Sequence, residues 1–563
     1  MNTVRSQVIP AKYFERFYLY LPYIIILWSI WFALQNQFLQ DDAFISFRYA
    51  ENLNKGYGLV FNPGERVEGY TNFLWTLLIS FGMKIGFQPE TFSIALGILL
   101  YTGTLITSLL IARRTWNDSF LISSFLFLLG SNYSFSSYAT GGLETPLVSF
   151  LVAGSIYCVQ GVLEYKKHSQ LRFFTIGLLL ALLFLTRMDS GLFITIIGVY
   201  LLIHLIKEKV KGAVKLTLIA LIPFLAIIFL WLTWKIHFYG SIFPNTLSAK
   251  TEGLFVFNLL SGVEYLHLFL TTYWIGPLFI VSIFYFSKKG KALYLSFLGL
   301  CISILFAQSC YLLSIGGDFM EFRFLVPFFP LIILLTVFAF NEAFGKIAIV
   351  PILLTITFSS FYFRIKDKMA VPFSYTGIES IQILKWHLKG PFEKWSLVGQ
   401  KFHEYFGDTE VRISVTAAGA IPYYSKLYTI DMLGLSDKNI KDPNRFRVLE
   451  NLKSGHKRYS TLNYLLEKNV NLVIAHPKFK FFNDDSPALF AAAAHLKPPE
   501  YKTLSIDSFF AFEILPEDRS LLNHPTFLWI PLDESTKLLV LYLKKSDAVD
   551  KMISDRNWEV IRY

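Results

Sequence analysis

Long apolar segments, each about the length of a membrane-spanning helix, decide what this chain can fold into. A helix needs roughly 20 apolar residues to cross about 30 Å of hydrocarbon. The 563 residues are 54% hydrophobic and only 17% charged, and a soluble chain of this length would carry more charge. The pattern predicts an α-helical polytopic membrane protein with about eleven transmembrane helices, near residues 17–37, 92–112, 118–136, 147–164, 172–186, 190–206, 216–237, 271–287, 292–313, 324–342 and 347–363.

Basic residues between the apolar segments predict the orientation of the chain. Cytoplasmic loops of membrane proteins are enriched in Lys and Arg. With the N-terminus in the cytoplasm, the alternation of spans places every basic cluster on that side: Arg113-Arg114, Lys166-Lys167, the segments 207–215 and 288–291, and Lys346. The net charge of +11 is explained by this orientation, and we predict no nucleic-acid partner.

The orientation requires that the apolar stretch 73–87 lies on the outer surface instead of crossing the bilayer. Its short length, its two glycines and Lys84 favour an interfacial helix. If this stretch crossed, every later loop would change side and the basic clusters would lie outside. We therefore predict a transmembrane domain over residues 1–363, with a first external loop over 38–91.

Residues 364–563 differ in composition from the spans and are predicted to form a separate domain. An odd number of spans leaves this segment outside the cytoplasm. It has charged and polar residues at ordinary soluble density, with β-like runs at Arg412-Ile413-Ser414-Val415 and Leu472-Val473-Ile474-Ala475. Its length is sufficient for a core of its own, so we expect a C-terminal extracytoplasmic α/β domain.

Five unusual polar motifs are all assigned to the outer side by this topology. Charges near membrane depth persist mainly where they pair or line a wet cavity. The motifs are Asp41-Asp42, Gly141-Gly142-Leu143-Glu144, Arg187-Met188-Asp189, the segment 239–250 with Asn245 and Lys250, and the segment 316–323 with Asp318 and Arg323. The alternative is a set of structural ion pairs, Asp189 with Arg187 and Asp318 with Arg323. An outward-facing polar cavity suits either a reaction or a transport site.

The residue types in these motifs suit glycosyl transfer. A carboxylate can take the proton from an acceptor hydroxyl or stabilise an oxocarbenium-like centre, and Arg makes bidentate contacts with phosphate oxygens. The chain has no Gly-rich phosphate loop of the nucleotide-binding type. A sugar donor that diffuses in the bilayer as a lipid phosphate is therefore favoured over a soluble nucleotide sugar.

A family resemblance rests on several blocks of sequence. They are the segments 41–49, 60–65 and 67–75, Pro244-Asn245-Thr246, the segment 316–320 with Arg323, and Asp431-Met432-Leu433-Gly434-Leu435-Ser436-Asp437. These blocks resemble the polytopic, lipid-phosphosugar-dependent glycosyltransferases of the GT-C superfamily. Within it they are most similar to the terminal β-(1→2) arabinofuranosyltransferase family of actinobacterial cell walls.

The resemblance implies a GT-C fold in a bacterial plasma membrane, with an acidic catalytic residue in the first external loop beside two surface helices. The implied donor is a polyprenyl-phosphate sugar, and the implied acceptor is an envelope glycan or glycolipid. The transferred sugar, arabinofuranose or another pentose, stays open at this point. So does the stereochemical outcome.

Roles within that frame are hypotheses. Asp41 is the first choice for the catalytic carboxylate, with Asp42 as helper or alternative. Candidates for the donor phosphate are Arg48, Arg187, Lys250 and Arg323, and Arg48 could instead pair with Asp41. Candidates for the sugar and acceptor are Glu68, Tyr70, Asn72, Glu144, Asp189, Asn245 and Asp318.

Metal and cofactor chemistry has only weak signals in the sequence. His403 and His456 lack metal-ligand spacing and are interpreted as surface or structural residues. A divalent cation at Asp41 and Asp42 stays open, although two adjacent acids without a third ligand are a weak signature. No other cofactor is predicted.

Two other functions compete with this interpretation. A transporter or flippase for lipid-linked sugars would also have many spans, but transporters usually contain two related halves, and no internal repeat is evident. A transferase acting on protein or lipid A differs from the favoured interpretation only in its acceptor.

Overall fold

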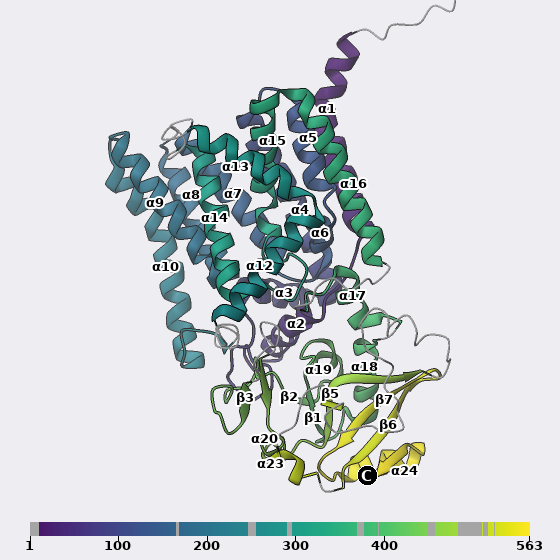
Figure 1. The fold of residues 1–563 in the computed structure, drawn as a ribbon. Helices are drawn as coiled ribbons and strands as arrows, with labels where there is room; N and C mark the ends of the chain where they lie inside the picture. Colours follow the sequence, from purple (N-terminus) through teal and green to yellow (C-terminus); the bar gives the residue numbers. More distant parts are fainter. Residues whose placement is uncertain are drawn as a thin grey trace, which may run out of the picture.

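The computed structural model describes residues 11–164, 168–245, 255–289, 296–368, 377–391, 393–448, 457–481, 509–510, 516–522 and 524–562. A bundle of helices forms one end of the molecule, and a β-sheet with short helices forms the other (Figure 1). Helices α2 (Asp41–Asn54) and α3 (Phe73–Lys84) lie between the two.

Seven described helical segments are long and apolar enough to cross a membrane. They are Pro89–Thr115 (α4), Thr145–Leu163 (α7), Met188–Lys207 (η2 and α9), Ala213–Tyr239 (α10), Phe297–Ile315 (α14), Val326–Phe344 (η4 and α15) and Lys346–Ile365 (η5 and part of α16, Ile349–Lys368). Shorter apolar helices are Leu19–Gln35 (in α1, Ala11–Gln35), α3, Ser119–Gly130 (α5) and Gln170–Thr186 (α8). The prediction of a helical polytopic membrane protein is confirmed, while the count of eleven spans stays a prediction.

Two of the predicted spans differ from the observed helices. The predicted span 118–136 is interrupted, because α5 ends at Gly130 and Asn132 caps a separate short helix, α6 (Tyr133–Ser137), followed by η1 (Tyr138–Thr140). The predicted span 271–287 corresponds to α13 (Ile275–Lys289), but α12 (Phe255–Thr272) was missed. Asn258, Glu264 and His267 dilute the apolar character of α12, so hydropathy alone does not detect it.

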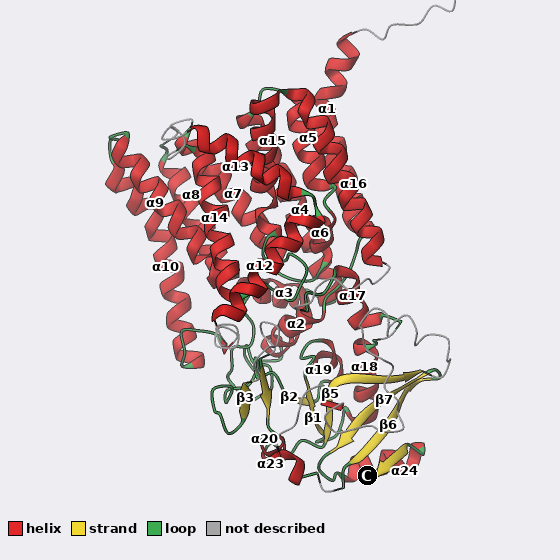
Figure 2. Ribbon diagram, in the orientation of Figure 1, coloured by secondary structure: helices red, strands yellow, loops and turns green. Residues whose placement is uncertain are grey.

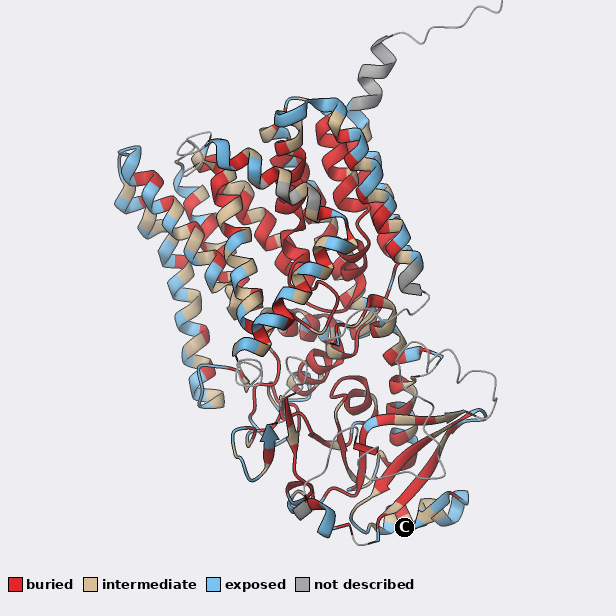
Figure 3. Cartoon of the chain, in the orientation of Figure 1, coloured by how far each residue is buried: buried red, intermediate tan, exposed pale blue. Residues whose placement is uncertain are grey.

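The outer helices of the bundle present apolar faces, as a lipid environment requires. The most apolar part of α10 has a mean hydropathy of 2.6, yet only 17% of it is buried inside the protein. Exposed residues follow the outer sides of α9, α10 and α16 (Figure 3). In water such a surface would drive association, whereas in a bilayer it contacts acyl chains.

The C-terminal region contains a mixed six-stranded sheet in the order β2-β1-β5-β7-β6-β8 (Figure 2). The strands are β1 (Arg412–Val415), β2 (Tyr428–Asp431), β5 (Leu472–Phe481), β6 (Thr526–Asp533), β7 (Thr536–Tyr542) and β8 (Glu559–Arg562). Strand β1 pairs in parallel with β2 and β5, and the other pairings are antiparallel. Both predicted β-like runs are strands, and the expected α/β character is confirmed.

Smaller elements complete this region. A two-stranded sheet joins β3 (Phe446–Val448) to β4 (Arg458–Ser460). The helices are α17 (Ile381–Lys389), α18 (Trp395–Phe406), α19 (Ala420–Ser425), α20 (Leu462–Glu467), α23 (Pro516–Ser520) and α24 (Asp547–Arg556). The apolar face of α18 packs Phe402 and Phe406 into the core.

Arg48 of α2 ties residues 38–91, the predicted first external loop, to the C-terminal region. Its Nε donates to the Phe61 carbonyl at 2.7 Å, and its Nη2 donates to the Leu427 carbonyl at 2.9 Å. A third bond runs from Nη1 to the Pro422 carbonyl. Arg48 is only 5% exposed, so these bonds also satisfy carbonyl groups that are shielded from water.

A close backbone contact reinforces this junction. A Cβ atom added at Gly69 would lie 2.4 Å from the Ser436 Oγ and 3.0 Å from the Ser436 Cα, so the loop is in close contact with the C-terminal region. The Asn62 side chain donates to the Thr429 carbonyl at 2.9 Å. The first external loop is therefore held on both sides, by the bundle and by the sheet region.

We expect Arg48→Met to destabilise the protein by about 3 kcal/mol, because buried carbonyl groups would lose a charged donor. The thermal unfolding midpoint of the purified protein in detergent measures this loss. The control is Arg66→Met, because Arg66 is exposed and its guanidinium lies over the Phe238 ring. Equal midpoints for the two variants would contradict the role given to Arg48.

Candidate active site

A cavity of about 400 Å³ lies where the bundle, the first external loop and the C-terminal region meet. The start of α2 and the loop segment 69–72 form one side. The turn before α7 and the segment after α14 contribute Glu144 and Arg323. The C-terminal region closes the opposite side with residues such as His387, Trp395 and His476. Its size suits a small ligand such as a sugar.

The two adjacent carboxylates at the start of α2 have different environments. Asp41 is 4% exposed, and its oxygens accept bonds from the backbone N–H groups of Ala420 at 2.8 Å and Gly419 at 3.2 Å. The Asp42 side chain is 36% exposed, and its Oδ2 lies 4.0 Å from the Arg323 Nη1. Successive helical residues point about 100° apart, so one carboxylate meets the C-terminal region and the other meets Arg323.

Burial raises the pKa of Asp41 to about 7, and the two backbone N–H bonds oppose the shift only in part. The cause is desolvation, which disfavours the charged form of a carboxyl group. Asp41 is therefore protonated more readily than an exposed carboxyl group.

Arg323 has a second carboxylate partner that fixes its orientation. Its Nε donates to the Asp318 Oδ2 at 2.7 Å, and the Phe319 N–H donates to Asp318 Oδ1 at 3.0 Å. The chain reaches this geometry after α14 through Gly316 and Gly317, whose φ values are +82° and +74°. At Gly317 an added Cβ would also lie 2.7 Å from Tyr265, so only glycine fits without displacement.

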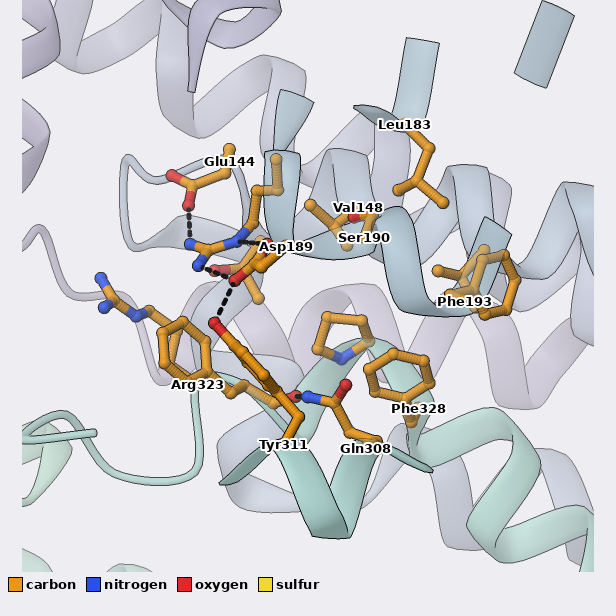
Figure 4. Close-up of a pocket in the computed structure, with 15 residues that line it drawn as sticks. Glu144, Val148, Leu183, Asp189, Ser190, Phe193, Gln308, Tyr311, Arg323 and Phe328 are labelled. Atoms are coloured by element: carbon orange, nitrogen blue, oxygen red, sulfur yellow. Dashed lines mark hydrogen bonds and ion pairs between the residues drawn. The ribbon is translucent and has the colours of Figure 1, made fainter. Parts of the chain in front are cut away.

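A second polar cluster lies beside the first, around a smaller pocket of about 40 Å³ (Figure 4). Arg187 bonds both oxygens of Asp189, at 2.9 and 2.5 Å, and reaches Glu144 Oε1 at 2.7 Å. Tyr311 donates to Asp189 at 3.2 Å. Glu144 and Arg323 line both pockets, so the two clusters are continuous. Towards α9 and α15 the lining becomes apolar, with Phe193 and Phe328.

Glu144 lines both pockets and takes part in both polar clusters. Burial opposes its charged form, but the guanidinium groups of Arg187 and Arg323 outweigh this effect and lower its pKa. Its Oε2 accepts a bond from the Asn72 side chain at 2.9 Å. Glu144 thus connects the first external loop to Arg187.

Other predicted residues pack around the cavity. Tyr70 and Asn72 line it, and the Tyr70 hydroxyl lies 3.2 Å from that of Tyr239. Glu68 forms a buried ion pair with Lys235 of α10 at 2.8 Å. Asn245 donates to the Asp437 carbonyl at 2.7 Å. Glu68 and Asn245 hold the loop to neighbouring elements and are not among the residues that line the cavity.

Some predicted contacts are not observed, and others fall outside the described residues. Arg48 does not pair with Asp41, because its guanidinium is occupied by carbonyl groups. Lys250 and His456 lie outside the described residues. The His403 Nδ1 lies 3.2 Å from the Ser425 carbonyl, which fits a structural role. The two predicted alternative ion pairs, Arg187–Asp189 and Arg323–Asp318, are both present.

Sequence reasoning missed the wall that the C-terminal region contributes. His387 lies 3.2 Å from Glu379 and 3.0 Å from Glu393, and its ring centroid lies 4.3 Å from that of Trp395. These residues are dispersed over a segment without a motif. The available signal was the unusual density of His, Trp and Glu between 379 and 395.

Within the described ranges, no group of three or more His, Cys, Asp or Glu side chains is placed to hold a metal ion.

Comparisons with known proteins agree with the resemblance. The chain is 24% identical over 352 residues to a terminal β-(1→2)-arabinofuranosyltransferase of Corynebacterium glutamicum, covering 56% of this chain and 50% of that protein. It is 27% identical over 233 residues to the Mycobacterium tuberculosis protein of the same name, covering 39% and 36%. The chain therefore spans about half or less of the length of these curated relatives. It is their distant homologue.

The fold resembles that of a solved membrane protein. ArnT from Cupriavidus metallidurans, crystallised bound to undecaprenyl phosphate, superposes with a TM-score of 0.52 at 11% identity, covering 93% of this chain and 97% of ArnT. The chain therefore has an ArnT-like arrangement of apolar helices with a C-terminal mixed α/β sheet region. Residues 391–520 match a domain of unknown function, DUF8728.

Buried carboxyl groups predict a pH dependence of stability. Burial raises the pKa of Asp431 to about 7, and N–H bonds from Ser436 and Leu433 oppose it in part. Between about pH 4 and pH 7 the folded chain keeps a proton that the unfolded chain has released. Raising the pH through this window therefore destabilises the fold, by at most about 1.4 kcal/mol per pH unit for one group, and no further loss is expected above it.

Asp431→Asn removes this titration and keeps an oxygen acceptor. We expect the thermal unfolding midpoint of the variant to rise relative to that of the wild type as the pH increases from about 4 to about 7. Parallel midpoint curves for the two proteins would show that Asp431 has an ordinary pKa.

Proposed function

We propose that this protein is an integral membrane glycosyltransferase. It moves a sugar, such as arabinofuranose or another pentose, from a polyprenyl-phosphate donor to an envelope glycan or glycolipid. The observation that supports this best is the approach of the Asp42 carboxylate to within 4.0 Å of the Arg323 guanidinium inside a polar cavity. A base and a phosphate-binding cation are the two groups that such a transfer requires.

Arg323 is the proposed ligand of the donor phosphate. Its Nε is held by Asp318, which leaves the Nη edge directed towards Asp42. Beyond Glu144, Arg187 provides a second positive charge. The smaller pocket then changes from polar residues to Phe193 and Phe328, as a lipid tail would require. The undecaprenyl phosphate bound to ArnT supports the same class of donor.

In the proposed reaction, an oxygen of the acceptor attacks the anomeric carbon of the donor sugar. The bond from that carbon to the phosphate oxygen breaks, and the polyprenyl phosphate leaves with the electron pair. Asp42 accepts the proton of the attacking hydroxyl. Arg323 stabilises the charge that develops on the departing phosphate. Asp41 serves as a positioning residue through its bonds to Ala420 and Gly419.

The reaction is proposed to occur on the extracytoplasmic face. Lys346 forms an ion pair with Asp118, so the turns before α5 and α16 lie together. This end of the bundle is opposite the sheet region (Figure 1). Both turns belong to predicted cytoplasmic loops, and the positive-inside rule then places the sheet region outside.

We expect Asp42→Asn to lower kcat at least about 100-fold, because the general base is lost, with little change in the donor KM. The assay is sugar transfer by the purified protein from a panel of polyprenyl-phosphate sugars that includes decaprenyl-phosphate arabinofuranose. The matched comparison is Asp41→Asn, which should affect the unfolding midpoint more than kcat. If both variants retain nearly normal transfer, neither carboxylate is the catalytic base.

We expect Arg323→Gln to weaken binding of undecaprenyl phosphate by at least about tenfold, since a charged contact to phosphate is removed. Arg323→Lys should recover only part of the affinity, because Lys cannot make a bidentate contact. Binding is measured on the purified protein in nanodiscs, with Arg66→Gln as the surface control. Wild-type affinity in Arg323→Gln would exclude Arg323 as the phosphate ligand.

A further inference from the structure

Arg323, the proposed phosphate ligand, follows a residue with a strained backbone. Phe322 has a φ of +45°, in the left-handed region that bulky side chains rarely adopt. It is fully buried and is not among the residues that line either pocket, so contact with a substrate does not explain this conformation. Strained residues persist only where the surrounding structure holds them, and they recur at functional sites. The contacts of Phe322 therefore bear on the direction of Arg323.

Helix α12 holds the ring of Phe322. Tyr265, Phe269 and Tyr273 follow one another at four-residue intervals, the first two within α12 and the third directly after it. Residues at this spacing share one face of a helix, and all three are buried. Each ring meets the Phe322 ring edge-on, with centroid distances of 5.9, 5.2 and 5.9 Å. We call these three residues the aromatic stripe, and such edge-to-face pairs stabilise an arrangement beyond the area that they bury.

The chain segment that leads to Phe322 is built around the first residue of this stripe. A Cβ added at Gly317 would lie 2.7 Å from the Tyr265 Cβ, and the Tyr265 hydroxyl donates to the Met320 carbonyl at 3.5 Å. The segment 317–322 therefore contacts the stripe at its start, its middle and its end. Its path from α14 to Arg323 depends on α12.

Glu321 fixes the chain directly before Phe322. Its N–H donates to the Glu379 carbonyl at 3.0 Å, and its own carbonyl accepts a bond from the Tyr138 hydroxyl at 2.8 Å. One oxygen of its buried carboxylate accepts a bond from the Ile381 N–H at 3.0 Å. Because the backbone of Glu321 and the ring of Phe322 are both held, the backbone between them has little freedom to relax.

We infer that the aromatic stripe of α12 is a positioning element for the donor phosphate, which acts through Phe322 on Arg323. The inference rests on the proposed role of Arg323 as the phosphate ligand. With Phe322 in the left-handed conformation, the Arg323 Nε meets Asp318 at 2.7 Å and its Nη1 lies 4.0 Å from Asp42. Relaxation of Phe322 to a negative φ would turn the chain at Arg323 and move the guanidinium from this position. The stripe is absent from the described lining of both pockets, so its effect passes through Phe322.

Two substitutions of Phe322 separate positioning from packing. Phe322→Leu loses the ring contacts and keeps a side chain that disfavours positive φ, whereas Phe322→Gly loses the ring but adopts positive φ without penalty. Removing more of a buried side chain destabilises more, so the thermal unfolding midpoint should be lowest in Phe322→Gly. The affinity for undecaprenyl phosphate in nanodiscs should instead be lowest in Phe322→Leu, weakened at least about tenfold against about threefold in Phe322→Gly. A role in packing alone would give both measurements the same order.

Phe269→Leu tests the stripe from the side of α12. Phe269 contacts the ring of Phe322, so its loss should weaken undecaprenyl phosphate binding by about tenfold. Adding Phe269→Leu to Phe322→Leu should weaken binding little further, because both changes remove the same contact. The matched control is Phe125→Leu, since Phe125 of α5 is also buried and packs on Trp116. This control should lower the unfolding midpoint and leave the affinity unchanged.

Two results would overturn the positioning role. One is a Phe269→Leu affinity equal to that of Phe125→Leu, which decides the matter by itself if Phe322→Gly does not fold. The other is phosphate binding in Phe322→Gly that is no tighter than in Phe322→Leu. Arg323→Gln is measured in the same series: wild-type affinity in that variant contradicts the proposed function, whereas weak binding there with normal binding in Phe269→Leu contradicts only the role of the stripe.

Discussion

The backbone N–H groups of Gly419 and Ala420 donate hydrogen bonds to the Asp41 carboxylate. The arrangement of the other residues around the cavity depends on this contact. It joins the first residue of α2 to the turn after β1, across 378 positions of sequence. Because Asp41 and Asp42 are adjacent residues of one helix, fixing Asp41 also sets the direction of Asp42. An added Cβ at Gly419 would lie 2.0 Å from the Asp41 carbonyl oxygen, so the contact also requires glycine there.

The contact between Asp41 and the Gly419–Ala420 backbone is specific, but burying the Asp41 carboxylate costs free energy. Removing a carboxylate from water is unfavourable, and two N–H bonds recover only part of that free energy. Arg48 adds charged bonds to Pro422 and Leu427 from the same helix. These bonds run to backbone carbonyls, so they specify the position of the chain more than the identity of the partner residues. The resulting junction encloses a polar cavity between the bundle and the C-terminal region.

The sequence predicted the parts of this protein whose signals are local. Apolar segments and basic loops predicted a polytopic bundle, and the β-like runs at 412–415 and 472–475 are strands. It also predicted that Glu144, Arg187, Asp189, Asp318 and Arg323 belong to one polar region, and these residues line the two joined pockets or, like Asp318, bind a residue that does.

What the sequence did not reveal depends on contacts between distant segments. Nothing in the pair Asp41-Asp42 indicates which one meets Gly419, because that partner lies in another region. Arg48 is the residue type expected of a phosphate ligand. Its guanidinium instead donates to carbonyl groups 374 and 379 positions away in the sequence. His387 and His476 belong to no motif, because one lies on α17 and the other on β5, and only the fold brings them to one cavity.

The balance of charge around Glu144 has a consequence for turnover. Arg187 is paired with Glu144 and Asp189, and Arg323 is paired with Asp318. A donor phosphodiester brings one negative charge, whereas a phosphate monoester, the product of the proposed reaction, approaches two near neutral pH. The same carboxylates that tolerate the donor then repel the product more strongly. A site with more positive charge would hold its donor better but would be inhibited by its own leaving group.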